Sequence, residues 1–465
     1  MKAMTPSLRF FLFAALALPG QDSPATRRLK QRNLELAPAI VHVAEGVYAA
    51  VGYTVSVNCM IVGETGVIII DPGQSIAGSR RVREEFAKIT NKPVSAIICT
   101  HSRADHTGGA PAFVDPDKTI PIWARANFGS EAATVQAAGI RVGVRPVNTQ
   151  GFDVPPEKRL GIGIAIPPNR PPAGSGMMRD GVANLPGAAQ APEARPMPPT
   201  HQFSEERRKL EIAGVQLELV AAPGETDDQL YVWLPSQRVV FSGDNFYQSW
   251  PNTYPLRGSA RRDIRMWADS VDKIVQENPL HLVGGHTKPI LNDARKVLEN
   301  YRDALRFVHQ KTMEGAEKFL TPDELVEYVK LPPEFAQLDY LGDYYGSVAG
   351  TVREIYAQHV GWFDGDPLNL HRLPPREQSE RMAALAGGAQ GLLEKARTAL
   401  AANDAVWAAQ LAQHAMRLQP AAKEPKLLLA EALDKIAEKT FNAPSRNYTF
   451  AFAARLRREA AGERP

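Results

Sequence analysis

The chain has 465 residues, a formal net charge of +3 and 23% charged residues. At this length more than one domain is expected, and the composition is that of a globular protein rather than a disordered or fibrous one. The small charge, without long basic runs, argues against nucleic acid as a partner. Two cysteines, Cys59 and Cys99, exclude a disulfide framework. Both lie in apolar runs that predict buried thiols, although a single disulfide stays open.

The N-terminus has the pattern of a secretory signal. Lys2 and Arg9 precede an apolar run over residues 10–18, and small or turn-forming residues follow. The run is too short to span a bilayer, and no later segment has about 18 consecutive apolar residues. We therefore predict a signal peptide over residues 1–25, a periplasmic or secreted protein, and no transmembrane segment. An apolar tail without a targeting role is the alternative.

Strand patterns dominate the next part of the chain. Apolar or alternating runs predict strand structure over residues 41–48, with a turn at Glu45-Gly46, and strands over residues 55–62, 66–70 and 94–99. Apolar residues at helical spacing predict one helix, over residues 76–90. Strands that first follow one another and then alternate with helices indicate a layered α/β domain with a partly antiparallel sheet.

Residues 140–205 interrupt this order. Clusters of proline and glycine, such as those at 167–176 and 196–199, break every periodic pattern. The segment is either a flexible linker or a lid over a substrate channel, because long loops within a domain are often functional.

Strands and then helices fill the rest of the chain. A hairpin is predicted over residues 210–220, and a helix over residues 261–277. Three more strands cover residues 230–234, 239–241 and 280–283. Beyond these, helical patterns cover residues 293–315, 340–360, 376–385, 389–402, 404–418 and 424–438, and another helix starts at residues 321–324. We therefore predict a layered domain over residues 26–292 and an all-helical domain over residues 293–465.

Acidic and imidazole side chains stand at the ends of four predicted strands. They are His101, Asp105 and His106, then Glu225 with Asp227 and Asp228, then Asp244, and last His286. Because strand ends on one side of a layered fold share an edge, we expect these groups to converge. Histidine nitrogen and carboxylate oxygen are ligands that Zn²⁺ accepts. The pattern predicts a metal site, although each group alone is more often a hydrogen-bonded structural residue.

These motifs resemble the metallo-β-lactamase superfamily over about residues 40–292. Residues 100–106 match its HxHxDH signature except at Arg103, which stands where the second histidine is expected. Glu225 stands where many members have histidine. The acid that braces the site, the bridging carboxylate and the last ligand match at Asp71, Asp244 and His286. The resemblance implies a metallo-β-lactamase-type αββα sandwich, followed by the helical domain.

Within that superfamily the chain is most similar to bacterial alkyl sulfatases. Residues 252–258 are similar to the segment of that group that ends in Leu-Arg-Gly. The helical half is similar to their dimerisation domain at residues 301–304, 320–324, 330–333, 344–346, 361–365, 381–388 and 446–448. The sequence lacks the sterol-carrier-like C-terminal domain that many relatives carry, so we expect no recruitment of alkyl chains by such a domain.

The resemblance implies a metal-dependent hydrolase of amphipathic sulfate esters, namely alkyl sulfates, that uses a zinc-activated water. The implied metal ligands are His101, Asp105, His106, Glu225, Asp244 and His286. Asp105 and Arg103 are predicted to act in catalysis. Arg257, with Asn252 and Tyr254, is predicted to bind the substrate, because a guanidinium offers a fork of donors to sulfate oxygens. A homodimer through the helical domain is also implied.

Arg103 leaves three hypotheses open, because a guanidinium cannot bind a metal. In the first, the site holds one zinc ion, and Arg103 grips the sulfate or balances Glu225. In the second, two zinc ions bind and Asp227 or Asp228 replaces the lost ligand. In the third, the chain is a weakly active relative that binds a sulfated or amphipathic ligand. We favour the first, since a fixed cation beside Glu225 disfavours a second dication.

Two other functions remain as alternatives. The first is a different ester or lactone hydrolase on the same scaffold. The second is a non-enzymatic protein in which the helical half is an interaction module. The set of ionisable residues argues against the second, because buried unpaired charges are costly in a purely structural core.

Overall fold

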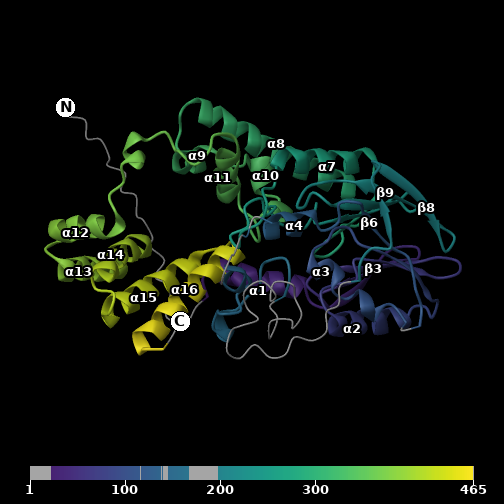
Figure 1. Cartoon of the computed structure of the whole chain (residues 1–465), viewed down its shortest axis with the longest axis horizontal. Coiled ribbons are helices and arrows are strands. Elements are labelled where there is room, and N and C mark those ends of the chain that lie inside the picture. The colour runs from purple at the N-terminus through teal and green to yellow at the C-terminus, as the bar shows by residue number, and fades with distance from the viewer. Residues whose placement is uncertain (1–21, 116, 138, 140–144, 167–196, 464–465) are drawn as a thin grey trace, which may run out of the picture.

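Two β-sheets packed face to face form the centre of the first half of the computed structural model (Figure 1). The structure describes residues 22–115, 117–137, 139, 145–166 and 197–463. Most of the predicted signal peptide and residues 167–196 of the irregular segment lie outside these ranges. The signal, linker and lid interpretations therefore stay predictions.

The first sheet has seven strands in the order of the chain. They are β1 (Ala39–Ala44), β2 (Val47–Val51), β3 (Asn58–Val62), β4 (Val67–Ile70), β5 (Val94–Ile98), β6 (Ile122–Arg125) and β7 (His201–Phe203). Strands β1 to β4 pair antiparallel, whereas β4 to β7 pair parallel. All of β4 is buried, as expected for a strand in the parallel part of a sheet that is covered on both faces.

The second sheet has five strands in the order β12-β11-β10-β9-β8. They are β8 (Arg207–Ile212), β9 (Val215–Ala221), β10 (Leu230–Leu234), β11 (Val239–Gly243) and β12 (His281–Gly284). The hairpin of β8 and β9 turns at Ala213 and Gly214, both with positive φ, as its sequence predicts. Only the β11–β12 pair of this sheet is parallel.

Apolar side chains of both sheets form the core between them, including Ile68, Ile98, Leu219 and Phe241. The helix α2 (Ile76–Ala87) covers the outer face of the first sheet through Val82 and Phe86. The helices α7 (Ile264–Gln276) and α8 (Ala294–Glu317) cover the second sheet, on the side opposite α2 (Figure 1). The αββα sandwich expected from the sequence is therefore confirmed.

The second half of the chain is helical and extends away from the sandwich (Figure 1). Its helices are α9 (Pro322–Tyr328), α10 (Pro333–Ala336), α11 (Val348–His359), α12 (Pro375–Ala386), α13 (Ala389–Ala401), α14 (Ala405–Leu418), α15 (Lys423–Lys439) and α16 (Ala443–Ala461). Helix α9 begins with a capping box between Thr321 and Glu324, which satisfies otherwise unpaired backbone groups. The last helices share one apolar core, which includes Leu392, Leu411 and Leu429.

Two expectations about local structure need correction. The single helix expected over residues 340–360 is a short 3-10 turn followed by α11, because Gly346 packs directly on the sandwich. A Cβ at Gly346 would lie 1.9 Å from the Pro251 carbonyl oxygen. The irregular segment also contains regular structure, namely β7 and the buried helix α5 (Arg145–Gln150). Both depend on distant partners: β7 pairs with β6 and α5 packs on α16.

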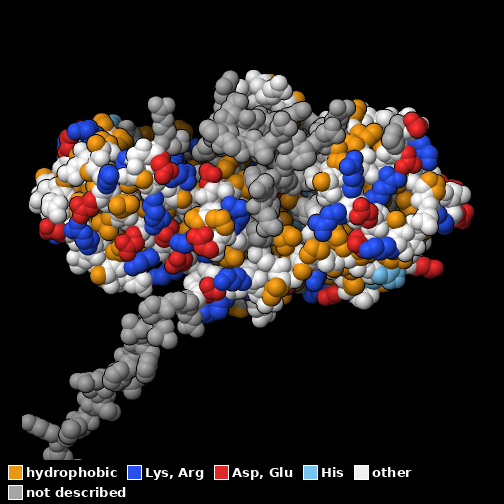
Figure 2. Space-filling view, turned by 90° about the horizontal axis from the view of Figure 1, so that it is seen from below, with side chains coloured by type: hydrophobic (Ala, Val, Ile, Leu, Met, Phe, Trp, Pro, Cys, Tyr) orange, Lys and Arg blue, Asp and Glu red, His pale blue; other side chains and the backbone are white. Residues whose placement is uncertain are grey.

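Other expectations can be compared with the structure directly. Cys59 and Cys99 are buried free thiols, so the single disulfide does not form. Within the described ranges, no helix combines the length and the apolarity that crossing a membrane requires. Basic and acidic side chains alternate over the face shown in Figure 2, as the small net charge suggests.

Candidate active site

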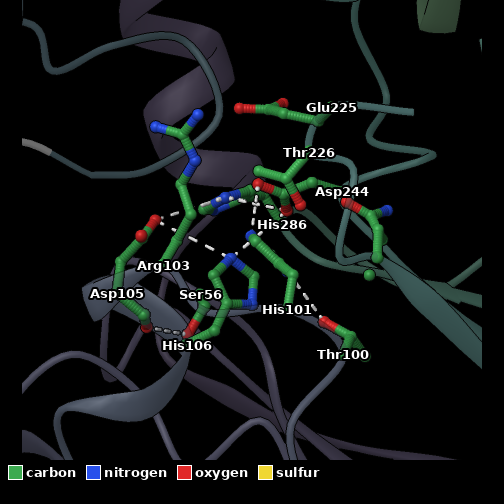
Figure 3. Close-up of polar contacts among 12 residues, drawn as sticks. Ser56, Thr100, His101, Arg103, Asp105, His106, Glu225, Thr226, Asp244 and His286 are labelled. Carbon is green, nitrogen blue, oxygen red and sulfur yellow. Dashed lines mark hydrogen bonds and ion pairs between the residues drawn. The ribbon is translucent and has the colours of Figure 1, made fainter. Parts of the chain in front are cut away.

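Five side chains meet where strands of both sheets end (Figure 3). His101 follows β5, while Asp105 and His106 lie on the one-turn helix α3 (Ala104–Thr107). Asp244 follows β11 and His286 follows β12. The backbone passes very close to the site, since a Cβ at Gly285 would lie 2.0 Å from Asp244 Oδ1. Only glycine fits at that position.

Asp244 lies at the centre of this cluster. Its Oδ1 is 3.2 Å from His106 Nε2 and 3.3 Å from His286 Nε2, and its Oδ2 is 3.5 Å from His101 Nε2. Asp105 Oδ2 is 3.7 Å from the Nε2 atoms of both His106 and His286. Three imidazoles and two carboxylates thus present their ends to one small space.

Hydrogen bonds fix all three imidazoles through their Nδ1 atoms. His106 Nδ1 donates to Asp71 Oδ2 at 2.8 Å, and His286 Nδ1 donates to the Val55 carbonyl at 2.8 Å. Thr100 donates its hydroxyl to Asp71, so His101 Nδ1 donates to Thr100 Oγ1 at 3.0 Å. With the Nδ1 protons held in this way, the Nε2 lone pairs point into the cluster. Such outer partners orient metal-binding histidines.

The donor set fits a divalent metal ion. One group of ligand atoms comes from Asp105, His106 and His286, and another from His101, His106 and Asp244; within each group the atoms lie within 4.8 Å of one another. His101 Nε2, His106 Nε2 and Asp244 Oδ1 are buried and have no hydrogen-bond partner among the described residues. Buried polar atoms are normally satisfied, so a shared ligand explains these three atoms.

The charges of the cluster shift the pKa values of its members. Burial favours a raised pKa for Asp244, but His106 and His286 hold that pKa well below its ordinary value. Burial favours a lowered pKa for His106, but Asp244 and Asp71 hold it well above its ordinary value. The carboxylates therefore stay ionised and attract positive charge, which a metal cation supplies in place of protons.

Glu225 lies outside both ligand groups, although it is a predicted ligand. Its Oε1 is 3.0 Å from Arg262 Nη1, and its Oε2 accepts a hydrogen bond from the Tyr247 hydroxyl at 3.2 Å. Both Glu225 and Arg262 are buried. The cation that balances Glu225 is therefore Arg262, which corrects the expectation of Arg103 in that role. The sequence offers only the Arg261-Arg262 pair before a helix, a pattern common on protein surfaces.

Arg103 turns away from the five-residue cluster and pairs with Glu131. Its Nη2 lies 3.0 Å and 2.9 Å from the two Glu131 oxygens, and Glu131 belongs to the helix α4 (Ser130–Ala137). Asp227 accepts a hydrogen bond from Ser130 at 2.6 Å, and Asp228 accepts one from Thr226 at 2.6 Å. Both aspartates thus have partners outside the cluster, and neither belongs to the two ligand groups.

The predicted substrate-binding residues border a small cavity of about 10 Å³ beside the site, which has room for about one water molecule. Arg257, Asn252 and Tyr254 all line it, and Arg257 Nη1 donates to the Tyr345 hydroxyl at 3.2 Å. Tyr254 shares its hydroxyl hydrogen bond with Ser347 at 2.7 Å. Residues from both halves of the chain therefore form this cavity.

Replacing Asp71 with asparagine is expected to weaken metal binding about 10- to 100-fold, the range for outer partners of metal ligands. Asparagine keeps the acceptor for the Thr100 backbone N–H and tolerates the positive φ of this position, 50°. It removes the charge that faces His106 Nδ1. Competition with a zinc chelator measures the affinity, and unchanged affinity would contradict this role.

The fold and the side-chain cluster are those of a hydrolase of the αββα class with a candidate metal site. The family model described as the metallo-beta-lactamase superfamily matches residues 52–286. The model described as alkyl sulfatase dimerisation matches residues 321–459. The chain belongs to the alkyl sulfatase family of the metallo-beta-lactamase superfamily.

Individual relatives agree with this assignment. A linear primary-alkylsulfatase from Pseudomonas sp. is 32% identical over 412 residues, which cover 87% of this chain and 74% of the relative. An (R)-specific secondary-alkylsulfatase from Pseudomonas sp. is 27% identical, over 92% of this chain and 64% of the relative. The solved structure of the stereoselective inverting sec-alkylsulfatase Pisa1 from Pseudomonas sp. has a TM-score of 0.78 at 25% identity, over 94% of this chain and 69% of its own.

Proposed function

We propose that this protein is a zinc-dependent hydrolase of sulfate esters, with alkyl sulfates as substrates. One observation carries the proposal: a buried set of metal-ligand atoms lies beside the cavity that Arg257 lines. The alkylsulfatase activities of the relatives support the substrate class.

Asp105, His106 and His286, together with Asp244, would hold one zinc ion. The ion would supply Lewis acidity and lower the pKa of a water molecule at neutral pH. His101 belongs to the second ligand group. Arg103 and Glu225 add no ligand atom to that group, because Arg103 pairs with Glu131 and Glu225 pairs with Arg262. One metal ion per chain is therefore the stoichiometry that these residues favour.

The remaining residues of the chain would position the ester. The Arg257 guanidinium offers donors to the sulfate oxygens, and the Tyr345 hydroxyl holds that guanidinium from the helical half. Asn252 and Tyr254 line the same cavity and would limit how the ester lies. Asp71 keeps the His106 ring oriented with its Nε2 toward the reacting group.

Parallel assays test this function. Alkyl sulfates of several chain lengths, lactones and β-lactams are offered to the purified protein, and sulfate release is measured directly. We expect release of inorganic sulfate from the alkyl sulfates and no comparable turnover of the other two classes. Preferred turnover of lactones would assign the site to the alternative ester chemistry, and no turnover of any class would favour the weakly active relative.

The proposal extends to assembly and location. A homodimer through the helical half is supported by the dimerisation model that matches residues 321–459 and by exposed apolar side chains there, including Trp362 at 80% and Leu385 at 85%. Sedimentation of a monomer at all concentrations would contradict the dimer.

The N-terminal sequence supports export to the periplasm or the medium, which fractionation of the native host would test.

A further inference from the structure

Three arginines lie on the side of the site where Glu225 stands. Arg262 is buried, with a side chain that is 1% exposed, and Arg103 is largely buried at 19%. Arg257 lines the adjoining cavity. Figure 3 shows the Arg103 guanidinium pointing to the same side as the Glu225 carboxylate. Burial lowers the pKa of Arg262, and the nearby charges of Arg103 and Arg257 lower it further while Glu225 opposes them.

Hydrogen bonds tie Arg262 to one small network that reaches the cavity lined by Arg257. Arg262 Nη1 contacts Glu225 and also donates to the Asn252 carbonyl. The Tyr247 hydroxyl links Glu225 to the Asn252 backbone N–H, with distances of 3.2 Å and 2.8 Å. Asn252 and Arg257 then border the same cavity. The charges of Arg262, Glu225 and Arg257 therefore contribute to the electrostatic potential that a ligand meets in that cavity.

The ion pairs of the network leave one positive charge without a partner. Glu225 neutralises Arg262 at 3.0 Å, and Glu131 neutralises Arg103 at 2.9 Å. Among the described residues, the hydrogen-bond partner of the Arg257 guanidinium is the neutral Tyr345 hydroxyl. Arginine stays protonated in proteins, so Arg257 is the one of these three guanidiniums that has no carboxylate partner in an ion pair among the described residues.

Some donors of the paired arginines also remain free. Arg103 Nε, Arg262 Nε and Arg262 Nη2 are buried and have no hydrogen-bond partner among the described residues. Buried donors without acceptors are costly. The oxygen atoms of an oxyanion would satisfy such donors.

We propose that the Arg103–Glu131 ion pair sets the charge selectivity of the site, so that it favours singly charged sulfate monoesters over doubly charged oxyanions. A phosphate monoester carries about −1.5 to −2 at pH 7, and inorganic sulfate carries two charges, whereas a sulfate monoester carries one. Glu131 cancels the charge of the Arg103 guanidinium on the Glu225 side of the site, and inorganic sulfate, the doubly charged product, is held less tightly as a result. This inference rests on the proposed function, because it concerns the same site.

The test is calorimetric titration of the intact, metal-loaded protein with inorganic sulfate and with inorganic phosphate. The variant Glu131→Gln keeps the size and one acceptor for Arg103 but leaves a second charge uncompensated. We expect it to bind both dianions about tenfold more tightly than the native protein, from Coulomb attraction at a few ångströms in a partly screened site. The ratio of phosphate-monoester to sulfate-ester turnover, measured as kcat/KM, should rise in the same variant.

Matched variants separate charge from structure. Glu131→Asp keeps the charge and should bind the dianions as the native protein does. Arg103→Gln with Glu131→Gln removes both charges and should not show the tighter dianion binding of Glu131→Gln. Asp227→Asn removes a different carboxylate that contacts α4, through Ser130, and should also leave binding unchanged.

The outcomes distinguish this inference from the proposed function. Unchanged dianion affinity in Glu131→Gln would overturn the inference, as would equal tightening in the charge-neutral double variant. Tighter dianion binding in Glu131→Gln alone would support the inference that the Arg103–Glu131 ion pair sets the charge selectivity. If the same protein released no sulfate from alkyl sulfates, the proposed activity would be contradicted.

Discussion

Replacing His106 with alanine is expected to remove the metal and to lower activity by more than about 100-fold, beyond the loss typical of outer partners. His106 belongs to both ligand groups, and its Nε2 is buried without a hydrogen-bond partner among the described residues. Its loss also deprives the Asp71 carboxylate of the imidazole it contacts at 2.8 Å. Zinc content by plasma emission and sulfate release measure the two effects together.

A distant histidine serves as the control for this variant. His371 is exposed in the helical half, so His371→Ala should keep both the zinc content and the activity of the native protein. Native zinc content in His106→Ala would show that the ligand set is assigned incorrectly. Full activity after complete removal of the metal by a chelator would contradict the metal-dependent mechanism itself.

Replacing Arg262 with methionine is expected to lower the free energy of unfolding by about 3 to 5 kcal/mol, because it leaves a buried carboxylate without its cation. Glu225 and Arg262 are both buried, and their ion pair joins the β9–β10 loop to the segment that precedes α7. Methionine fills a similar volume, so the main loss is electrostatic. Equilibrium urea denaturation followed by tryptophan fluorescence measures the change.

Two further variants make this test specific. The double variant Arg262→Met with Glu225→Gln removes both charges and should recover most of the lost stability, since Tyr247 can still donate to the amide oxygen. Arg261→Met changes the exposed neighbour and should stay close to the native value. A double variant as unstable as the single one would show that shape, rather than charge, explains the loss.

The metal cluster was predictable because short-range signals mark it. His101, Asp105 and His106 directly follow the buried run that forms β5, and Asp244 and His286 each follow an apolar strand. Strand ends on one side of such a fold share an edge, so their convergence follows from topology. The αββα layers could be expected from the strand and helix patterns together with the family resemblance.

The ion-pair network was not predictable, because its partners lie far apart in the chain. Arg103 meets Glu131 across 28 residues, and Glu131 lies on a helix that buries no side chain and gives no amphipathic signal. Arg262 is one of two adjacent arginines, and only the fold decides that it is buried while Arg261 is exposed. Likewise, α5 forms because it packs on α16, and β7 forms because it pairs with β6. Tertiary contacts of this kind override local sequence patterns.

Counting zinc in the purified, active protein tests the central claim most directly, namely that Arg103 and the Arg262–Glu225 pair leave a site for a single metal ion. Plasma emission should give about one zinc ion per chain in a preparation that releases sulfate from alkyl sulfates. About two zinc ions per chain would contradict the account, because Glu225 and its neighbours would then have to serve as ligands.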